Sequence, residues 1–265
     1  MEKQIVINDN LISYSQTGEG ERAVIFLHGW RSNKEVWNQV IQRIRELENE
    51  RIRIYSIDLP GFGGSSAPKT AWCVGDYAEI VKGYIEKLEL KNVIIVGHSF
   101  GGRIGIKLAA NPYPASGHPL PEGEGKLKGL ILVDAAGFAM NANKKTIISA
   151  AAKLTKPFFK PKFMQGLRKK IYQKIGAEDY LATPELQQTY VKVISEDLTE
   201  DLKKITLPTL IITGENDKDT PIEFGRKMNS LIPNSEFQIL KNAGHYSFID
   251  QPEEFVNNIL EFMSS

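Results

Sequence analysis

Cysteine is almost absent from this sequence, since Cys73 is the only one. A lone thiol forms no internal disulfide and no cysteine-rich metal site, and it agrees with a reducing compartment. Long hydrophobic runs are also absent, and the first ten residues lack the basic and then apolar pattern of a secretory signal. We therefore expect a soluble, cytoplasmic protein without stable membrane insertion, in which Cys73 is a buried or half-buried structural thiol.

An excess of charge of one sign is missing as well, because 33 lysines and arginines face 32 aspartates and glutamates. This balance argues against nucleic acid as a partner. The distribution is less even, since residues 138–204 hold 13 basic and only 7 acidic side chains. Such a segment would attract anionic substrates or a membrane surface, or simply form a solvated helix face, and the solvated face is the default interpretation.

Short apolar runs rich in β-branched residues recur along the chain, and helical patterns at 36–47, 76–88 and 252–263 separate several of them. This alternation predicts an α/β fold with a doubly wound, mostly parallel eight-stranded sheet. The first two runs are joined by a short turn and predict an antiparallel hairpin at one edge. The expected strands are residues 4–7, 11–14, 24–27, 52–57, 93–96, 130–133, 210–213 and 237–240.

Two segments interrupt the alternation. Residues 111–125 are so rich in proline and glycine that they predict a surface loop. Residues 138–204 follow the sixth strand and are mostly helical in pattern, with an apolar stripe at four-residue spacing. We expect them to form a small helical cap, or lid, on a core domain of residues 1–137 and 205–265. Three residues of the stripe are expected to contact the substrate, namely Phe163, Leu167 and Ile171.

A glycine-flanked serine stands between the fifth strand and a helix-compatible stretch, in the sequence Gly97-His98-Ser99-Phe100-Gly101. A sharp strand-to-helix turn that presents a serine needs residues without bulk two positions before and two positions after it. The pattern therefore predicts a nucleophile elbow with Ser99 as the nucleophile.

A serine hydroxyl needs a base to remove its proton, and the chain has only four histidines. His28 follows a strand, His98 points away from the serine in an elbow, and His118 lies in the proline-rich loop. His245 follows the last strand and precedes the last helix, at the edge of the sheet where Ser99 is expected. We therefore predict His245 as the general base.

The histidine in turn needs a carboxylate that fixes its tautomer. Asp217 follows the seventh strand and gives the chain order serine, acid, histidine. Glu215 and Asp219 are nearby rivals, and Asp134 at the end of the sixth strand is a serious alternative. We predict Asp217 as the acid, and we expect Asp134 to cap a turn or to accept hydrogen bonds from backbone N–H groups.

Attack of a serine on a carbonyl creates an oxyanion that needs preorganised hydrogen-bond donors. The residue after the nucleophile, Phe100, can supply its backbone N–H. The second donor is expected from the loop after the third strand, where His28-Gly29 precedes Trp30 and places its N–H in register with the elbow.

The assembled pieces resemble the α/β-hydrolase family over nearly the whole chain. These pieces are His28-Gly29-Trp30, the segment 58–65, the elbow at 97–102, the segment 214–217 and Gly244-His245. The chain looks most like the small capped branch with carboxylesterases, lipase-like enzymes and carbon–carbon bond hydrolases, whose cap follows the sixth strand.

This resemblance also narrows the expected activity. Haloalkane dehalogenases and epoxide hydrolases carry aspartate where this chain has Ser99, and cofactor-free haloperoxidases usually have methionine at the position of Phe100. The carbon–carbon hydrolases usually have a glycine-rich stretch after His-Gly and tryptophan after the catalytic histidine, where this chain has Trp30-Arg31-Ser32 and Tyr246. The resemblance thus implies hydrolysis of small or medium-chain carboxylic esters, through an acyl-enzyme on Ser99 and without a metal or organic cofactor. The alternatives are a carbon–carbon bond hydrolase and a non-catalytic ligand-binding protein.

Overall fold

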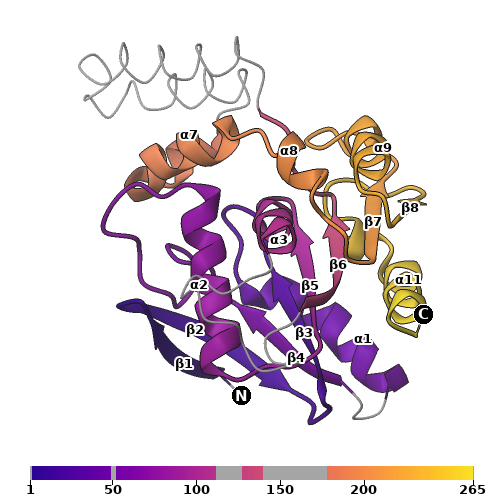
Figure 1. Ribbon diagram of the computed structural model, residues 1–265, viewed down its shortest axis with the longest axis horizontal. Helices are drawn as coiled ribbons and strands as arrows, with labels where there is room; N and C mark the ends of the chain where they lie inside the picture. Colours follow the sequence, from indigo (N-terminus) through magenta and orange to yellow (C-terminus); the bar gives the residue numbers. More distant parts are fainter. Residues whose placement is uncertain (1, 49–51, 112–126, 140–177, 265) are drawn as a thin grey trace, which may run out of the picture.

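The computed structural model describes residues 2–48, 52–111, 127–139 and 178–264. Within these residues eight strands form one sheet in the order β1-β2-β4-β3-β5-β6-β7-β8 (Figure 1). Each of the eight expected strands is present, and most are longer than the apolar run that predicted them. The strands are β1 (Glu2–Ile7), β2 (Asn10–Thr17), β3 (Arg22–Leu27), β4 (Ile52–Ile57), β5 (Val93–His98), β6 (Leu127–Val133), β7 (Thr209–Gly214) and β8 (Ser235–Leu240).

The strand pairing confirms an antiparallel hairpin beside a parallel sheet. β1 and β2 pair antiparallel at one edge, β2 also runs antiparallel to β4, and the six strands from β4 to β8 are parallel. The register pairs Leu27 with Gly97 and His98 with Val133 where these strands end. The loops after β3, β5, β6, β7 and β8 therefore leave the sheet at one common edge, where ligands bind in such folds.

Helices cover both faces of the sheet, which confirms the doubly wound arrangement (Figure 1). One face carries α2 (Val74–Lys87), α3 (Phe100–Ala110) and α9 (Ile222–Leu231). The other carries α1 (Asn38–Glu48) and α11 (Pro252–Ser264), with the short η1 (Lys34–Trp37) and α10 (Ser247–Asp250). None of the described helices is long and apolar enough to span a membrane.

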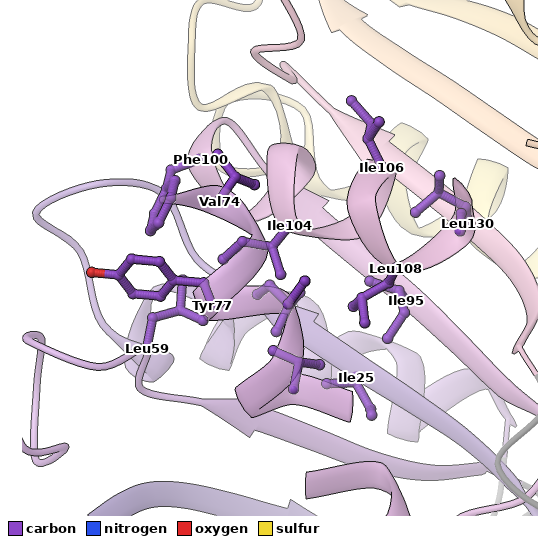
Figure 2. Close-up of a cluster of buried hydrophobic side chains, with 14 of the residues drawn as sticks. Ile25, Leu59, Val74, Tyr77, Ile95, Phe100, Ile104, Ile106, Leu108 and Leu130 are labelled. Carbon is purple, nitrogen blue, oxygen red and sulfur yellow. The ribbon is translucent and has the colours of Figure 1, made fainter. Parts of the chain in front are cut away.

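Each face of the sheet has its own hydrophobic core. Along β3, Ile25 contributes to the α2–α3 side, whereas Val24 and Phe26 contribute to the α1–α11 side. Burial on both faces explains why the central strands read as continuous apolar runs. Figure 2 shows the α2–α3 side, where side chains of β3, β5 and β6 meet those of the two helices. At roughly 1.5–3 kcal/mol for each large apolar side chain buried, this packing makes a firm support for the strand ends.

The described part of the expected cap is helical, with α6 (Glu178–Ala182), η3 (Pro184–Leu186), α7 (Gln187–Ser195) and α8 (Thr199–Leu202). Leu198 and Leu202 are fully buried and belong to the same core as α3. The Arg103 side chain of α3 donates hydrogen bonds to the carbonyl oxygens of Phe138, at 2.6 Å, and Glu196, at 2.8 Å. Hydrogen bonds from α3 thus hold residues near both ends of segment 138–204. That this segment forms a separate cap stays a prediction.

Candidate active site

Ser99 lies in the turn between β5 and α3 with φ of +50° and ψ of −106°. A positive φ is uncommon for a residue other than glycine and indicates backbone strain. A Cβ at Gly97 would collide with the Gly101 carbonyl, and a Cβ at Gly101 would collide with the Leu27 carbonyl. The glycines of the Gly-x-Ser-x-Gly pattern are therefore required by the close approach of backbone to backbone.

The loop after β3 lies directly against this turn. A Cβ at Gly29 would lie 2.8 Å from His98 Nδ1 and 3.4 Å from Ser99 Cβ. The next residue, Trp30, packs edge-on against Phe100 with 5.1 Å between ring centroids. Phe100 is the first residue of α3, so its N–H has no partner within the helix. The structure thus brings together the two residues expected to donate to an oxyanion, although that role stays a prediction.

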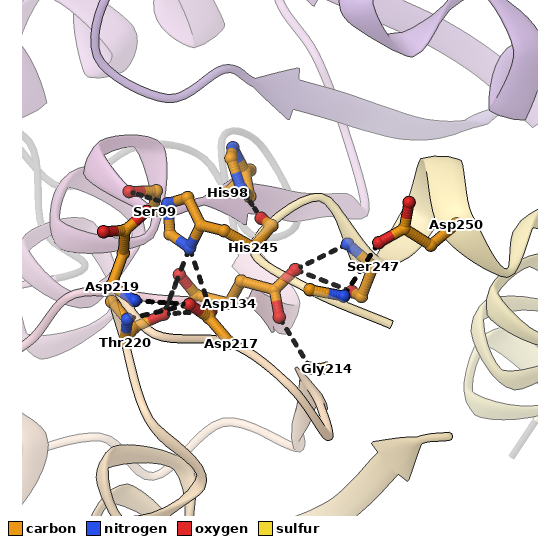
Figure 3. Close-up of polar contacts among 11 residues, drawn as sticks. His98, Ser99, Asp134, Gly214, Asp217, Asp219, Thr220, His245, Ser247 and Asp250 are labelled. Carbon is orange, nitrogen blue, oxygen red and sulfur yellow. Dashed lines mark hydrogen bonds and ion pairs between the residues drawn. The ribbon is translucent and has the colours of Figure 1, made fainter. Parts of the chain in front are cut away.

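Ser99, His245 and Asp217 form one hydrogen-bonded chain (Figure 3). Ser99 Oγ lies 3.1 Å from His245 Nε2, and His245 Nδ1 lies 2.9 Å from Asp217 Oδ2. The serine hydroxyl is the donor to Nε2 and the imidazole N–H is the donor to the carboxylate, because a carboxylate can only accept. The loops after β5, β7 and β8 supply one member each.

The Asp217 carboxylate is held in direction by its own loop. Its Oδ1 accepts the backbone N–H groups of Asp219 at 2.8 Å and Thr220 at 3.0 Å. Its Oδ2 accepts the Thr220 hydroxyl at 2.6 Å as well as the imidazole N–H. The hydrogen bond to His245 is therefore formed by a carboxylate that is already oriented.

The pKa values of the acid and the histidine move in opposite directions. Burial alone would raise the pKa of Asp217, but hydrogen bonds from His245 and Thr220 outweigh burial and lower it. Burial alone would lower the pKa of His245, but the hydrogen bond and charge of Asp217 outweigh burial and raise it above 6.5. Both shifts favour the charged pair, so the site stabilises an imidazolium when one forms.

The rival acids have other partners. Asp134 Oδ1 accepts the Gly214 N–H at 2.8 Å, and its Oδ2 accepts the Ser247 N–H at 3.0 Å and hydroxyl at 2.6 Å. Glu215 accepts the N–H of Asn242 at 3.0 Å. Asp134 thus satisfies backbone N–H groups as expected, and Asp217 is the carboxylate that contacts the imidazole.

His98 has a part in the site that the sequence did not reveal. Its Nε2 lies 2.7 Å from the His245 carbonyl oxygen, and its ring lies 4.9 Å from the His245 ring. Burial lowers the pKa of His98 to about 3, so the ring is neutral and its Nε2–H donates to that carbonyl. His98 points away from Ser99 and fixes the backbone of the histidine loop instead. Its position directly beside the elbow serine was the signal that could have found it.

The loop after β3 is fastened to the loop after β4. His28 Nε2 accepts the Leu59 N–H at 3.0 Å, and burial lowers the pKa of His28 to about 4. Asp58 is fully buried and accepts the Lys34 ammonium at 2.9 Å and the Lys34 N–H at 2.7 Å. These contacts hold the backbone that carries Trp30.

Three aromatic side chains pack around Trp30, the residue after Gly29. The Trp30 ring packs against Phe62, Phe100 and Tyr190 with centroids 5.0, 5.1 and 5.2 Å away. Tyr190 comes from α7 in the insertion and is 5% exposed. Sequence reasoning missed Tyr190 because its contact spans far-separated segments. The three residues expected to contact substrate, Phe163, Leu167 and Ile171, lie outside the described residues.

Two further features concern ligands. Asp217, Asp219 and His245 are a group within the described ranges whose possible metal-binding atoms lie within 4.8 Å of one another. A metal there would compete with the hydrogen bond between Asp217 and His245. A cavity of about 600 Å³ lies at the opposite, amino edge of the sheet, away from Ser99. Its lining includes Arg22, Asn92, Lys128, Thr209, Asn234 and Phe262.

The sequence profile described as the Alpha/beta hydrolase family matches residues 24–258. The chain belongs to this family. One relative is the AB hydrolase superfamily protein YisY of Bacillus subtilis (strain 168), 28% identical over 267 residues, with 92% of each chain covered. Another is a 2-hydroxy-6-oxononadienedioate/2-hydroxy-6-oxononatrienedioate hydrolase of Pseudomonas sp, 23% identical, with 96% of this chain and 92% of the relative covered.

Solved structures agree with the family assignment. An esterase (EaEST) from Exiguobacterium antarcticum superposes with a TM-score of 0.77 and 27% identity, and 100% of both chains is covered. The enol-lactonase from Burkholderia xenovorans LB400 has a TM-score of 0.74 over 99% of this chain and 100% of its own, and its 18% identity shows the fold alone. The protein is therefore a hydrolase of this family, and its relatives differ in the bond that they cleave.

Proposed function

We propose that this alpha/beta hydrolase cleaves carboxylic esters of small or medium-chain substrates through an acyl-enzyme on Ser99. The observation that carries the proposal is the chain from Ser99 Oγ through His245 to Asp217, at 3.1 and 2.9 Å. It joins a nucleophile, a base and an orienting acid in the geometry that acyl transfer requires.

The chemistry follows from these positions. Ser99 Oγ attacks the ester carbonyl carbon while its proton moves to His245 Nε2. The Asp217 carboxylate stabilises the imidazolium, and the N–H groups of Trp30 and Phe100 bind the oxyanion. His245 then gives the proton to the departing alcohol, which leaves the acyl group on the serine. The same nitrogen then takes a proton from a water that attacks the acyl carbon, and His245 returns this proton to Ser99 Oγ as the acid leaves.

The aromatic residues around Trp30 support an apolar acyl group. The partly buried Trp30 ring packs against Phe100 and Tyr190, and it follows Gly29, which lies against Ser99. Such rings favour hydrocarbon over water. A contact of Phe163, Leu167 and Ile171 with longer acyl chains stays a prediction.

An ester panel tests this proposal. Purified protein is assayed with p-nitrophenyl esters of rising chain length beside Ser99→Ala and a matched control, Ser264→Ala, whose exposed hydroxyl donates to the Leu260 carbonyl of its own helix. We expect turnover of short and medium chains, a loss of about 10³-fold or more in Ser99→Ala, and normal rates in the control. Equal rates in Ser99→Ala, or no turnover by the folded wild type, would reject the proposal.

Carbon–carbon bond hydrolysis is the second candidate, because several relatives carry the name of a dienedioate hydrolase. Carbon–carbon hydrolases usually have a glycine-rich stretch after His-Gly and tryptophan after the catalytic histidine, where this chain has Trp30-Arg31-Ser32 and Tyr246. We therefore expect 2-hydroxy-6-oxononadienedioate to be turned over far more slowly than the best ester, and the reverse order would favour the second candidate.

A further inference from the structure

Three loops that carry the active-site side chains meet at Asp134, the residue directly after β6. Its N–H donates to the Ile212 carbonyl of β7 at 2.9 Å, and its carbonyl oxygen lies 3.0 Å from the hydroxyl oxygen of Thr220, whose proton goes to Asp217 Oδ2. Next to it, the backbone of Val133 accepts the Ser99 N–H at 3.0 Å. Asp134 thus lies between the elbow and the loop of Asp217.

The carboxylate of Asp134 extends this connection to the histidine loop. Oδ1 accepts the N–H of Gly214, where the loop of Asp217 begins, and Oδ2 accepts both the N–H and the hydroxyl of Ser247, two residues after His245. Figure 3 shows the carboxylate between these two partners. One side chain therefore joins the loop of the acid to the loop of the base, beside the direct hydrogen bond from the Asn216 N–H to the Ala243 carbonyl at 2.8 Å.

We propose that Asp134 is a positioning residue of the active site, which fastens the loop of Asp217 to the loop of His245 and supports positive charge on His245. The inference rests on the serine-hydrolase chemistry proposed above. Asp134 acts through His245 and contacts no reacting atom, unlike Asp217.

The backbone and burial of Asp134 agree with this role. Its φ is +44°, a conformation that non-glycine residues adopt rarely and at a cost, so the surroundings must compensate for it. The side chain is fully buried and accepts three hydrogen bonds. Burial of a carboxylate costs free energy, and the donors that offset this cost lie at Gly214 and Ser247, next to the active-site loops. This placement favours a role in the active site over the capping of a turn.

The charge of Asp134 responds to pH near neutrality. Burial raises the pKa of Asp134 to about 7, although the hydrogen bonds from Ser247 and Gly214 act in the opposite direction. The ionisable groups near it are Asp217, whose charge also raises this pKa, and His245, whose pKa the charge of Asp134 raises. His98, on the neighbouring strand β5, is neutral because burial lowers its pKa.

The charge of Asp134 determines how strongly it supports a protonated His245. Above its pKa, Asp134 is charged and favours the imidazolium that forms during the reaction. Below its pKa, Asp134 is a neutral acid and this support is lost. An Asn at this position mimics the neutral form in shape and charge at every pH.

Asp134→Asn is therefore compared with wild type at about pH 8.5 and pH 6, with p-nitrophenyl acetate and with correction for spontaneous hydrolysis. We expect kcat at pH 8.5 to fall by about three- to tenfold with little change in KM, which corresponds to less than about one pKa unit at His245. The ratio of wild type to variant should shrink towards one at pH 6. Asp201→Asn is the matched control, because it removes a carboxylate of α8 that is paired with Lys107 of α3, and it should show a ratio near one throughout.

Ser247→Ala supplies an independent arm that keeps the carboxylate. Loss of the Ser247 hydroxyl as a donor raises the pKa of Asp134, so Asp134 takes up its proton at higher pH. Because protonated Asp134 no longer supports the imidazolium, kcat/KM should begin to fall at higher pH in Ser247→Ala. In Asp134→Asn the same decline should move to lower pH, because the charge that raises the pKa of His245 is gone. Merely damaged packing would not shift the two variants in opposite directions.

A loss in Asp134→Asn that stays constant between pH 6 and 8.5, or no loss at all, would overturn the inference. Should Asp134→Asn fail to fold, an unshifted decline in Ser247→Ala would overturn it alone. These failures differ from failure of the proposed function, in which the wild type itself would turn over no ester.

Discussion

The loops after β6 and β7 each present a buried aspartate at the same edge of the sheet, and the two side chains have different partners. Asp134 is 0% exposed and accepts the N–H groups of Gly214 and Ser247 and the Ser247 hydroxyl, and burial raises its pKa to about 7. Asp217 is 6% exposed and accepts the imidazole N–H, and its pKa is lowered despite burial. Strand ends thus bring both carboxylates to the site, whereas the donors around each carboxylate determine its role.

Among the variants of the two aspartates, replacement of Asp217 should lower kcat the most. Asp217→Asn can present its amide to Nδ1, which leaves His245 in the wrong tautomer, a change that costs about 10⁴-fold in kcat in chymotrypsin-like proteases. We expect a loss of at least roughly a hundredfold in kcat with a short activated ester, against less than about tenfold for Asp134→Asn at the same pH. Glu215→Gln, on the same loop, should remain near wild type, because its side chain accepts the Asn242 N–H and a glutamine oxygen can still do so.

The order of the two asparagine variants decides the assignment of the acid. Each variant is first shown to be folded by circular dichroism. If Asp134→Asn is the crippled variant and Asp217→Asn is near normal, the acid of the triad follows β6 and the assignment is wrong in that member.

Loss of Asp217 should also shift the pH dependence of kcat/KM, which is a smaller effect. The base is active when neutral, so kcat/KM should fall on acidification as His245 takes up a proton. Because Asp217 raises the pKa of His245, the midpoint in the wild type should lie above 6.5. In Asp217→Asn the residual activity should decline at lower pH, since the raising charge is lost. A flat profile from about pH 5 to 8 would contradict a histidine base.

Much of this arrangement could be predicted from the sequence because local physics dictates it. The central strands are buried on both faces and read as apolar runs, and the elbow needs Gly97 and Gly101 because backbone carbonyls leave no room for a Cβ. His245 could be assigned because only four histidines exist and one follows the last strand.

Other features depend on packing between distant segments and left no local pattern. The placement of β4 outside β3, and its antiparallel pairing with β2, is not encoded in apolar runs that look alike. The choice between Asp134 and Asp217 depends on which loop brings its donors to which carboxylate. The contacts of His98 with the histidine loop and of Tyr190 with Trp30 join residues far apart in sequence.

Covalent labelling shows whether Ser99 is a nucleophile that His245 and Asp217 activate. The protein is incubated with a p-nitrophenyl phosphonate, and the adduct is located by intact mass and peptide mapping. We predict one adduct per chain, on Ser99, with labelling slowed strongly in Asp217→Asn and only slightly in Asp134→Asn. An unlabelled folded protein, an adduct on another residue, or equal labelling rates in wild type and Asp217→Asn would contradict the account.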